Sequence, residues 1–417
     1  MSGIAATVPS FKDARHLAEQ QAALIRDQET ETLDLLDAAG RVLSESIHAD
    51  RNLPPFPRST RDGYAVRAAE VADVPATLAL IGEIRAGENP NTMLRQIGAG
   101  ETASIMTGAP VPFGADAVVM VEYTEQQGAQ VKINKGVVPG ENVVPAGAEA
   151  RQGSVLVERG QRLNDAAIAL AASAGKSQLQ VYKRPRVAVL TTGDEIVGID
   201  TLPGPTQIRN SNSYSLAVQI REAGGEAVLL PIAPDQSSKL RSLIEEGLKA
   251  DLLLMTGGVS MGRYDLVEQV LGELKAEFFF TGAKIQPGRP IVFGKCGATA
   301  AENAGTYFFG LPGNPVSTMV TFELFARPML EALAGTSPRK LRFVHARLKS
   351  EIRIKPGLTR FLPAHLSGEF EDSKVELVSW HGSGDVAATA RANCYIVIAP
   401  HLELIPAGEF VPILLRG

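Results

Sequence analysis

The chain has 417 residues, of which 45% are hydrophobic and 21% charged, and it carries a formal net charge of −5. Its length favours two to four domains of roughly 100–200 residues each. The acidic balance argues against general nucleic-acid binding, which needs a basic face.

The cysteines and the apolar runs argue against further classes of protein. Cys296 and Cys394 are far apart and are the chain's two cysteines, so a disulfide framework and a zinc site are not indicated. The first residues lack the basic start and apolar stretch of a signal peptide. No apolar run is long enough to cross a bilayer. We therefore expect a cytoplasmic protein that binds no membrane.

The first part of the chain predicts helices that flank a β-rich insertion. Ser10 and Asp13 form a capping-box pattern before a helix over residues 11–25, and residues 33–47 continue with helical character. The proline-rich stretch 52–59 is a boundary. Short β-type runs follow at 77–84, 102–108 and 117–124. A capped helix over Asn164–Gly175 and a strand over 177–182 are expected to pack against the N-terminal helices. The predicted domains are residues 1–50 plus 146–182 (helical) and 51–145 (β-rich).

Residues 183–335 have the regular pattern of an α/β domain. Apolar strands are expected at 186–193, 226–235, 251–258 and 306–313, and helices at 212–225, 236–250, 265–274 and 316–333. Continuous apolar strands that alternate with helices indicate a doubly wound parallel sheet covered on both faces. Residues 340–417 contain short alternating runs and should form a small all-β barrel or sandwich.

The exits of these strands are where ligands bind in such a sheet. Four carboxylates are expected there, two after the first strand and one after each of the next two. The exit residues are Thr192, Gly193, Asp194 and Glu195; Asp235; Gly257, Gly258, Ser260 and Asp265; and Pro312, Gly313, Asn314, Pro315 and Ser317. Clustered acids repel one another unless a cation lies between them, and Mg²⁺ prefers such oxygen ligands. Asp235 and Asp265 could equally cap the helices that follow.

The glycine-rich exits favour a phosphorylated ligand. Backbone amides approach an anion closely where no Cβ intervenes, and a helix N-terminus attracts phosphate. Lys284 and Arg289 flank a Pro-Gly turn and could clamp an anion or simply be solvated. Arg263 could likewise contact the phosphates or simply be solvated. Asp62 and Thr107 lie in likely turns of the β-rich segment, and nothing local assigns them to the site.

Several motifs carry a resemblance to a known family. "STRDGYAV", "IMTGAPVPFGADAVVMVE", "TTGDEIV", "NSNSY", "TGGVSMGRYD", "PGRP", "GLPGNPVS" and "HGSGD" occur in the order found in the MoeA/gephyrin E-domain family. The resemblance implies four domains, with a molybdopterin-binding α/β domain third, and a homodimer in which the inserted domain of one subunit faces the α/β domain of the other.

The resemblance also implies a reaction and a set of site residues. Family members insert molybdate into adenylylated molybdopterin and release AMP, with Mg²⁺ on Glu195, Asp235 and Asp265. The implied catalytic set is Asp62, Thr107, Glu195, Asp235 and Asp265. The resemblance makes Pro312 and Pro315 site-shaping residues and places Ser383 in the matching barrel loop. A molybdopterin adenylyltransferase and molybdoenzyme acceptors are the implied partners.

Some positions depart from the family pattern. The segment "QPGRP" has Gln286 and Arg289 where lysines are usual, and "PAGAEA" has Glu149 where Asp is common. Substituting Arg for Lys keeps the charge but changes the geometry. The alternatives to an active molybdenumtransferase are a non-catalytic molybdopterin-binding scaffold, a tungstate-preferring insertase and an enzyme that adenylylates molybdopterin.

Overall fold

The computed structural model describes residues 8–26, 28–88, 96–258, 266–297, 305–337 and 340–416. The predicted site residues Ser260 and Asp265, and Arg263, lie outside these ranges. The described chain forms two compact units. One contains the residues up to Thr32, Gly40–Ser44 and the chain from Gln180 onward, and the other contains Leu33–Ala39 and Glu45–Leu179.

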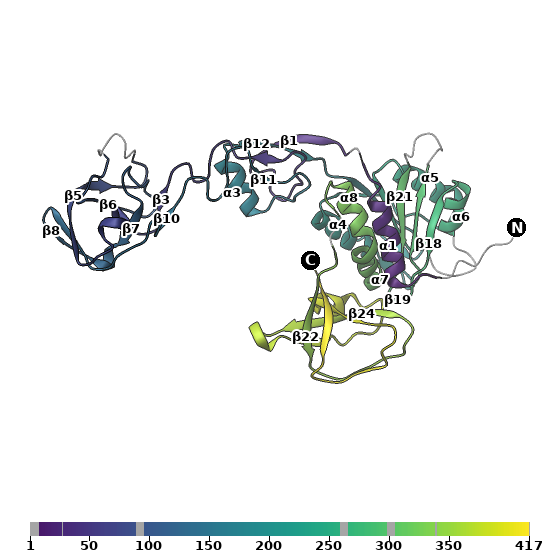
Figure 1. The fold of residues 1–417 in the computed structure, drawn as a ribbon. Helices are drawn as coiled ribbons and strands as arrows, with labels where there is room; N and C mark the ends of the chain where they lie inside the picture. The colour runs from purple at the N-terminus through teal and green to yellow at the C-terminus, as the bar shows by residue number, and fades with distance from the viewer. Residues whose placement is uncertain are drawn as a thin grey trace. The chain divides into compact units, whose positions relative to one another are not determined.

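A six-stranded sheet is the centre of the first unit (Figure 1). Its order is β16-β13-β17-β21-β20-β18, and its strands are β13 (Arg186–Thr191), β16 (Glu226–Leu229), β17 (Leu252–Thr256), β18 (Glu277–Thr281), β20 (Val292–Cys296) and β21 (Thr306–Leu311). The chain leaves β13 to form β16 on one side and returns to form β17 on the other, so the strand order reverses at β13.

The prediction of an all-parallel sheet was wrong in one respect. The four predicted strands, β13, β16, β17 and β21, are mutually parallel. Strands β18 and β20 were not predicted, and β20 runs antiparallel to both of its neighbours. The turn between β18 and β20 allows antiparallel pairing without a crossover helix, as at the edges of many mixed sheets.

Apolar residues alternate between two cores, which shows that both faces of the sheet are covered. Val187 and Val189 of β13 belong to one core, and Ala188 and Leu190 to the other. The first core contains residues of α4 (Asn212–Ala223), α7 (Pro315–Thr321), the π-helical turn Phe322–Ala326 and α8 (Arg327–Leu333). The second contains residues of α5 (Ser237–Gly247) and α6 (Leu266–Glu273). This alternation is the expected period of two along a strand.

Helix α1 (Phe11–Ala22) belongs to this α/β unit. Ser10 caps it by accepting a hydrogen bond from the Asp13 N–H at 3.2 Å, as predicted. Its buried alanines, Ala14, Ala18 and Ala22, pack into the first core, and the helix lies beside α8 (Figure 1). The small side chains allow this close helix packing.

Two expectations for the helical segments were wrong. Residues 33–47 do not form a helix: β1 (Thr30–Asp34) pairs with β12 (Gln178–Tyr182), and turns follow up to Gly40, which has φ of 75°. Helix α3 (Asp165–Ser173), capped by Asn164 as predicted, packs on β11 (Val155–Val157), whereas α1 packs into the α/β core. Strand pairing and core contacts override helix propensity in such short segments.

The end of the chain forms a closed barrel. Strand β24 (Thr359–Ser367) pairs with both β25 (Lys374–Leu377) and β26 (Cys394–Ile398). The ring is completed by β22 (Phe343–Leu348) and β28 (Phe410–Leu415). Of the two predicted architectures, barrel or sandwich, the barrel is present. A short strand from the α/β part, β19 (Ile285–Gln286), also pairs with β24.

The second unit contains the predicted β-rich segment. Its six-stranded sheet has the order β7-β4-β6-β5-β9-β8. The strands are β4 (Gly63–Val66), β5 (Ala76–Ile84), β6 (Glu101–Ile105), β7 (Ala117–Met120), β8 (Thr124–Gln127) and β9 (Gln130–Ile133). The runs predicted at 77–84 and 102–108 correspond to β5 and β6. The run at 117–124 contains β7, a 3-10 turn (Val121–Tyr123) and the first residue of β8. Tyr64 and Val66 lie in one core and Ala65 in another, so this sheet also buries residues on both faces.

Candidate active site

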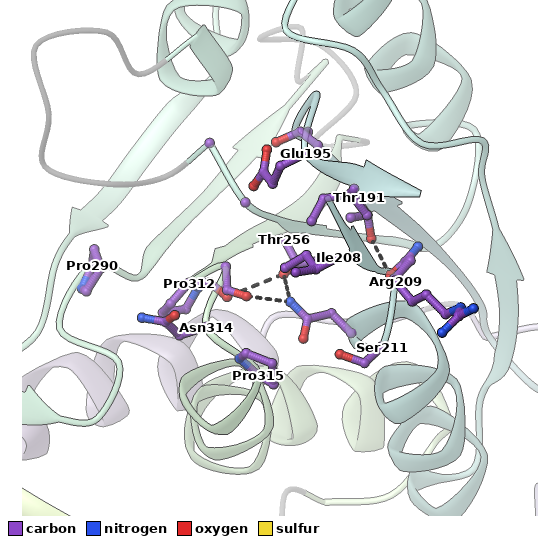
Figure 2. A pocket seen from close by; sticks show the side chains of 17 residues that line it. Thr191, Glu195, Ile208, Arg209, Ser211, Thr256, Pro290, Pro312, Asn314 and Pro315 are labelled. Atoms are coloured by element: carbon purple, nitrogen blue, oxygen red, sulfur yellow. Dashed lines mark hydrogen bonds between the residues drawn. The ribbon is translucent and has the colours of Figure 1, made fainter. Parts of the chain in front are cut away.

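A pocket lies where the strand order reverses, at the ends of β13, β17 and β21 (Figure 2). Its cavity volume is about 360 Å³. The described residues that line it are Thr191, Thr192, Glu195, Ile196, Ile208, Arg209, Asn210, Ser211, Asn212, Thr256, Gly257, Gly258, Pro290, Pro312, Gly313, Asn314 and Pro315. Three of the four predicted strand exits therefore meet in one cavity, at the position where open α/β sheets bind ligands.

Glycine is required at the end of β17 because the backbone turns against Thr192. Gly257 has φ of 90° and Gly258 has φ of 63°. A Cβ on Gly257 would lie 2.5 Å from the Thr192 carbonyl oxygen, and one on Gly313 would lie 3.4 Å from the Gly257 Cα. A side chain on Gly257 would therefore clash with the exit of β13, whereas one on Gly313 would make an ordinary contact with Gly257.

A buried hydrogen-bond network joins these exits to α4. The Asn212 side chain donates from Nδ2 to Thr256 Oγ1 at 2.9 Å and to the Gly313 carbonyl at 2.7 Å (Figure 2). Thr256 Oγ1 donates in turn to the Pro312 carbonyl at 3.3 Å. These bonds fix the three loops that form the pocket wall.

Two buried oxygens of pocket-lining residues lack a hydrogen-bond partner among the described residues. They are Thr192 Oγ1 and Asn212 Oδ1. Leaving a buried polar group unpaired costs about 1–3 kcal/mol. Their almost complete burial places both atoms within the pocket wall rather than on its accessible surface.

The segment Arg209–Asn212 was not predicted as part of the site. This segment forms part of the pocket wall because β15 (Ile208–Arg209) pairs in parallel with β14 (Ile196–Val197). Strand β14 begins directly after Glu195, which also lines the pocket. The available signal was the run of Asn and Ser at residues 210–213, which spans the start of α4. The same residues would be expected in a simple helix cap, so sequence alone did not separate the two roles.

The predicted acids take different positions. Glu195 lines the pocket. Asp194 instead accepts a hydrogen bond on Oδ1 from the Asp235 N–H at 3.1 Å, and neither of these two residues is among the described residues that line the pocket. Within the described ranges there is no group of three or more His, Cys, Asp or Glu residues that could hold a metal ion.

The predicted anion clamp also lies elsewhere. Lys284 and Arg289 are exposed and, with Gln286, are not among the described pocket-lining residues. The Lys284 N–H donates to the Pro9 carbonyl, and the Lys284 carbonyl accepts from the Thr359 N–H. This segment therefore joins α/β elements to the barrel, and its neighbour Pro290 is the residue that reaches the pocket.

The start of α7 contacts the barrel. The Ser383 carbonyl accepts a hydrogen bond from the Val316 N–H at 3.0 Å. Ser317 is buried, and its carbonyl accepts from Thr321 Oγ1 at 2.8 Å. Asn314 is the cap position of α7, and Pro315 takes the first helical position.

Asp62 and Thr107 lie together in the β unit. Asp62 Oδ1 accepts hydrogen bonds from the Thr107 N–H at 2.6 Å and from the Thr107 hydroxyl at 2.9 Å. The backbone bond, followed by the hydroxyl bond, holds the pKa of the Asp62 carboxyl below its ordinary value. Both side chains are exposed. The two hydrogen bonds from Thr107 therefore hold the Asp62 carboxylate in a preorganised orientation on the surface of this unit.

Comparison with known proteins places the chain in a family. The MoeA N-terminal region (domain I and II) matches residues 9–175, a probable molybdopterin binding domain matches 188–332, and the MoeA C-terminal region (domain IV) matches 345–415. A protein of a Nostoc species named molybdopterin molybdenumtransferase is 34% identical, with 98% of this chain and 94% of that protein covered. The chain belongs to the MoeA family.

Other MoeA relatives agree over the same length. A Bacillus subtilis protein named molybdopterin molybdenumtransferase is 32% identical, with 93% of this chain and 90% of that protein covered. A solved MoeA protein from Pyrococcus horikoshii has a TM-score of 0.79 at 26% identity and covers 98% of this chain and 100% of its own. The pocket lies in the part that matches the molybdopterin-binding domain, whereas Asp62 and Thr107 lie in the MoeA N-terminal region.

Proposed function

We propose that this MoeA chain is a molybdopterin molybdenumtransferase that inserts molybdate into adenylylated molybdopterin. Water cleaves the phosphoanhydride and AMP leaves. The two dithiolene sulfurs of molybdopterin replace one oxide ligand of molybdate, which departs as water with the two thiol protons. The observation that supports this most directly is the near full-length similarity to proteins of that name, together with a polar pocket in the matching molybdopterin-binding part. A scaffold without catalysis, a tungstate-preferring insertase and an adenylylating enzyme are not favoured by these relatives.

The pocket residues would hold the substrate between the strand exits. Gly257, Gly258 and Gly313 expose backbone to the ligand, and Glu195 supplies a carboxylate at the pocket wall. Pro312 and Pro315 shape the turn into α7. Binding in such a cavity would orient the phosphoanhydride for the attacking water.

Magnesium is part of the proposal. Mg²⁺ is commonly held by one or two carboxylates together with substrate phosphates, rather than by a complete protein cage. One pocket-lining carboxylate, Glu195, fits that donor set, and Asp265 and Asp235 are the further candidates. Bound Mg²⁺ would neutralise charge on the phosphates.

We further propose that the protein is a cytoplasmic homodimer. In this arrangement the Asp62–Thr107 pair of one subunit completes the pocket of the other. The exposure of this preorganised carboxylate supports a role toward another molecule.

Within the described residues, no helix is both long and apolar enough to cross a membrane. A molybdopterin adenylyltransferase would supply the substrate, and molybdoenzymes would take the product.

The test is a single-turnover assay of AMP release. Purified protein receives adenylylated molybdopterin and Mg²⁺, with and without molybdate, under anaerobic conditions. We expect molybdate-dependent AMP release in the wild type and its loss in Asp62→Ala, Glu195→Ala and Asp265→Ala. Gln127→Ala, on the β unit, and Lys239→Ala, on α5, serve as surface controls. Tight binding of the substrate with no AMP release in any condition would reject a transferase.

A further inference from the structure

Three buried side chains form a closed ring of hydrogen bonds beside the pocket. They are Thr191 at the end of β13, Asn210 directly after β15 and Ser213 in the first turn of α4, and their exposed fractions are 3%, 8% and 2%. Asn210 Nδ2 donates to Ser213 Oγ at 2.9 Å, and Thr191 Oγ1 donates to Asn210 Oδ1 at 3.3 Å. The two hydroxyl oxygens, Thr191 Oγ1 and Ser213 Oγ, lie 2.8 Å apart.

The direction of each bond in this ring is fixed by the groups that take part. The Ser213 backbone N–H donates to Asn210 Oδ1 at 3.1 Å, so this end of the amide is the oxygen. A hydroxyl has one hydrogen, and that of Thr191 is donated to Asn210. The Ser213 hydroxyl therefore donates to Thr191, so that each side chain in the ring both donates and accepts. Buried hydrogen bonds connected in this way strengthen one another.

The ring closes a loop that carries a large part of the pocket wall. Thr191 and Asn210 flank residues 192–209, so their hydrogen bond joins the two ends of this loop. Inside the loop, the Ile208 N–H donates to the Glu195 carbonyl at 2.8 Å. Five loop residues line the pocket: Thr192, Glu195, Ile196, Ile208 and Arg209 (Figure 2). The place of Glu195 at the pocket wall is therefore tied through β15 to the ring.

We propose that Thr191, Asn210 and Ser213 are positioning residues that close this loop and hold Glu195 in place for the reaction. The inference rests on the proposed function, because it takes Glu195 to be catalytic. The exits of β17 and β21, which carry the glycines of the pocket, are held separately by the hydrogen bonds of Asn212. Opening the ring should therefore slow the reaction more than it weakens the binding of substrate.

The substitution Thr191→Val tests the ring because it removes the hydroxyl and keeps the β-branched shape. We expect amide hydrogen exchange to become about 10-fold faster in peptides that cover residues 194–210, because loss of the ring lets this loop open locally. Single-turnover AMP release should slow at least about 10-fold, whereas the dissociation constant of adenylylated molybdopterin, measured without molybdate, should change by less than about 3-fold. Thr191→Ser keeps the hydroxyl and should behave as the wild type in all three measurements.

A second variant and a matched control accompany this substitution. Ser213→Ala opens the ring at another corner and should give the same pattern as Thr191→Val, so the inference stays testable if one of the two proteins does not fold. Thr306 lies at the end of β21 that is away from the pocket, and its hydroxyl donates to the Leu248 carbonyl at 2.8 Å. Thr306→Val therefore loses a comparable hydrogen bond in the same unit, and it should leave loop exchange, AMP release and substrate binding unchanged.

Three outcomes would overturn the inference. Unchanged loop exchange in the ring-opened variants would mean that the ring does not hold the loop. A Thr191→Ser protein as slow as Thr191→Val would mean that the hydroxyl is not what matters, and a loss of substrate affinity as large as the loss of rate would indicate general damage to the pocket. No AMP release by the wild type rejects the proposed function and, with it, the catalytic role given to the ring. Normal release by the wild type with unchanged loop exchange in the variants removes this inference alone.

Discussion

Thr107 donates two hydrogen bonds to a single oxygen of Asp62, although the two residues are 45 positions apart in the chain. Sequence alone placed each residue in its own turn. The antiparallel pairing of β4 with β6 brings the end of one strand beside the start of the other. The resulting carboxylate has a fixed orientation and a pKa below its ordinary value.

Replacing Thr107 by Val should raise the pKa of Asp62 only part of the way to its ordinary value. The hydroxyl bond is lost, but the larger cause of the shift, the backbone N–H of residue 107, remains. A carboxyl with a lowered pKa stabilises the fold above its unfolded pKa and loses that contribution as the pH falls through the folded value. The variant should therefore lose this contribution at a higher pH than the wild type.

A carboxyl-carbon NMR titration of Asp62 measures this shift. Thr77→Val, at an exposed position of strand β5, keeps the β-branched shape and should leave the Asp62 titration unchanged. An unchanged Asp62 pKa in Thr107→Val would show that the hydroxyl bond does not form in solution.

Adding a methyl group to Gly257 should damage the pocket. The new Cβ would lie 2.5 Å from the Thr192 carbonyl oxygen, and the φ of 90° is unfavourable for any side chain. We expect Gly257→Ala to lower the free energy of unfolding by roughly 1–3 kcal/mol and to weaken molybdopterin binding at least about 10-fold. Chemical denaturation and equilibrium binding provide the two measurements.

Gly272 is the matched control for that substitution. It lies in α6, with no atom within 4 Å of the position of an added Cβ. Gly272→Ala should stabilise the protein by about 0.4–1 kcal/mol and leave binding unchanged. Equal losses of binding in the two variants would mean that the tight turn at Gly257 has no particular role in the pocket.

Both cysteines should be unreactive in the folded protein. Burial raises the pKa of the Cys394 thiol to about 11 and also raises the pKa of the Cys296 thiol. At pH 8 about one Cys394 thiol in a thousand would be ionised, and thiolate is the reactive form. A colorimetric thiol reagent should detect no fast-reacting group in native protein and two per chain after denaturation. Rapid reaction of native protein would show that a cysteine is exposed in solution.

Mixed dimers should reveal whether the site is formed by two subunits. Asp62→Ala and Glu195→Ala are each expected to be inactive alone. If the Asp62 side of one subunit serves the pocket of the other, half of the sites in a heterodimer contain both native residues. Random mixing after denaturation and refolding should then restore about a quarter of wild-type AMP release. No recovery despite confirmed subunit exchange would place both residues in the site of a single chain.

The α/β part was the most predictable region of the fold. The four parallel strands and their helices were predicted because buried parallel strands are continuously apolar and the helices have a separate period. Strands β18 and β20 were missed, since only a Pro-Gly turn was predicted between the helix at 265–274 and the strand at 306–313. The predicted helix at residues 33–47 failed because pairing of β1 with β12 decides that region.

The sequence by itself determined that polar and glycine-rich exits follow apolar strands, and therefore where a pocket should lie. Its motifs also determined the family. Only the tertiary structure decided which exit residues face the cavity: it placed Glu195 and Asn212 there, joined Asp194 to the Asp235 backbone and set Lys284 beside the barrel. The physical reason is that strand exits are defined by local patterns, whereas side-chain contacts depend on strand order, register and the turns between distant segments.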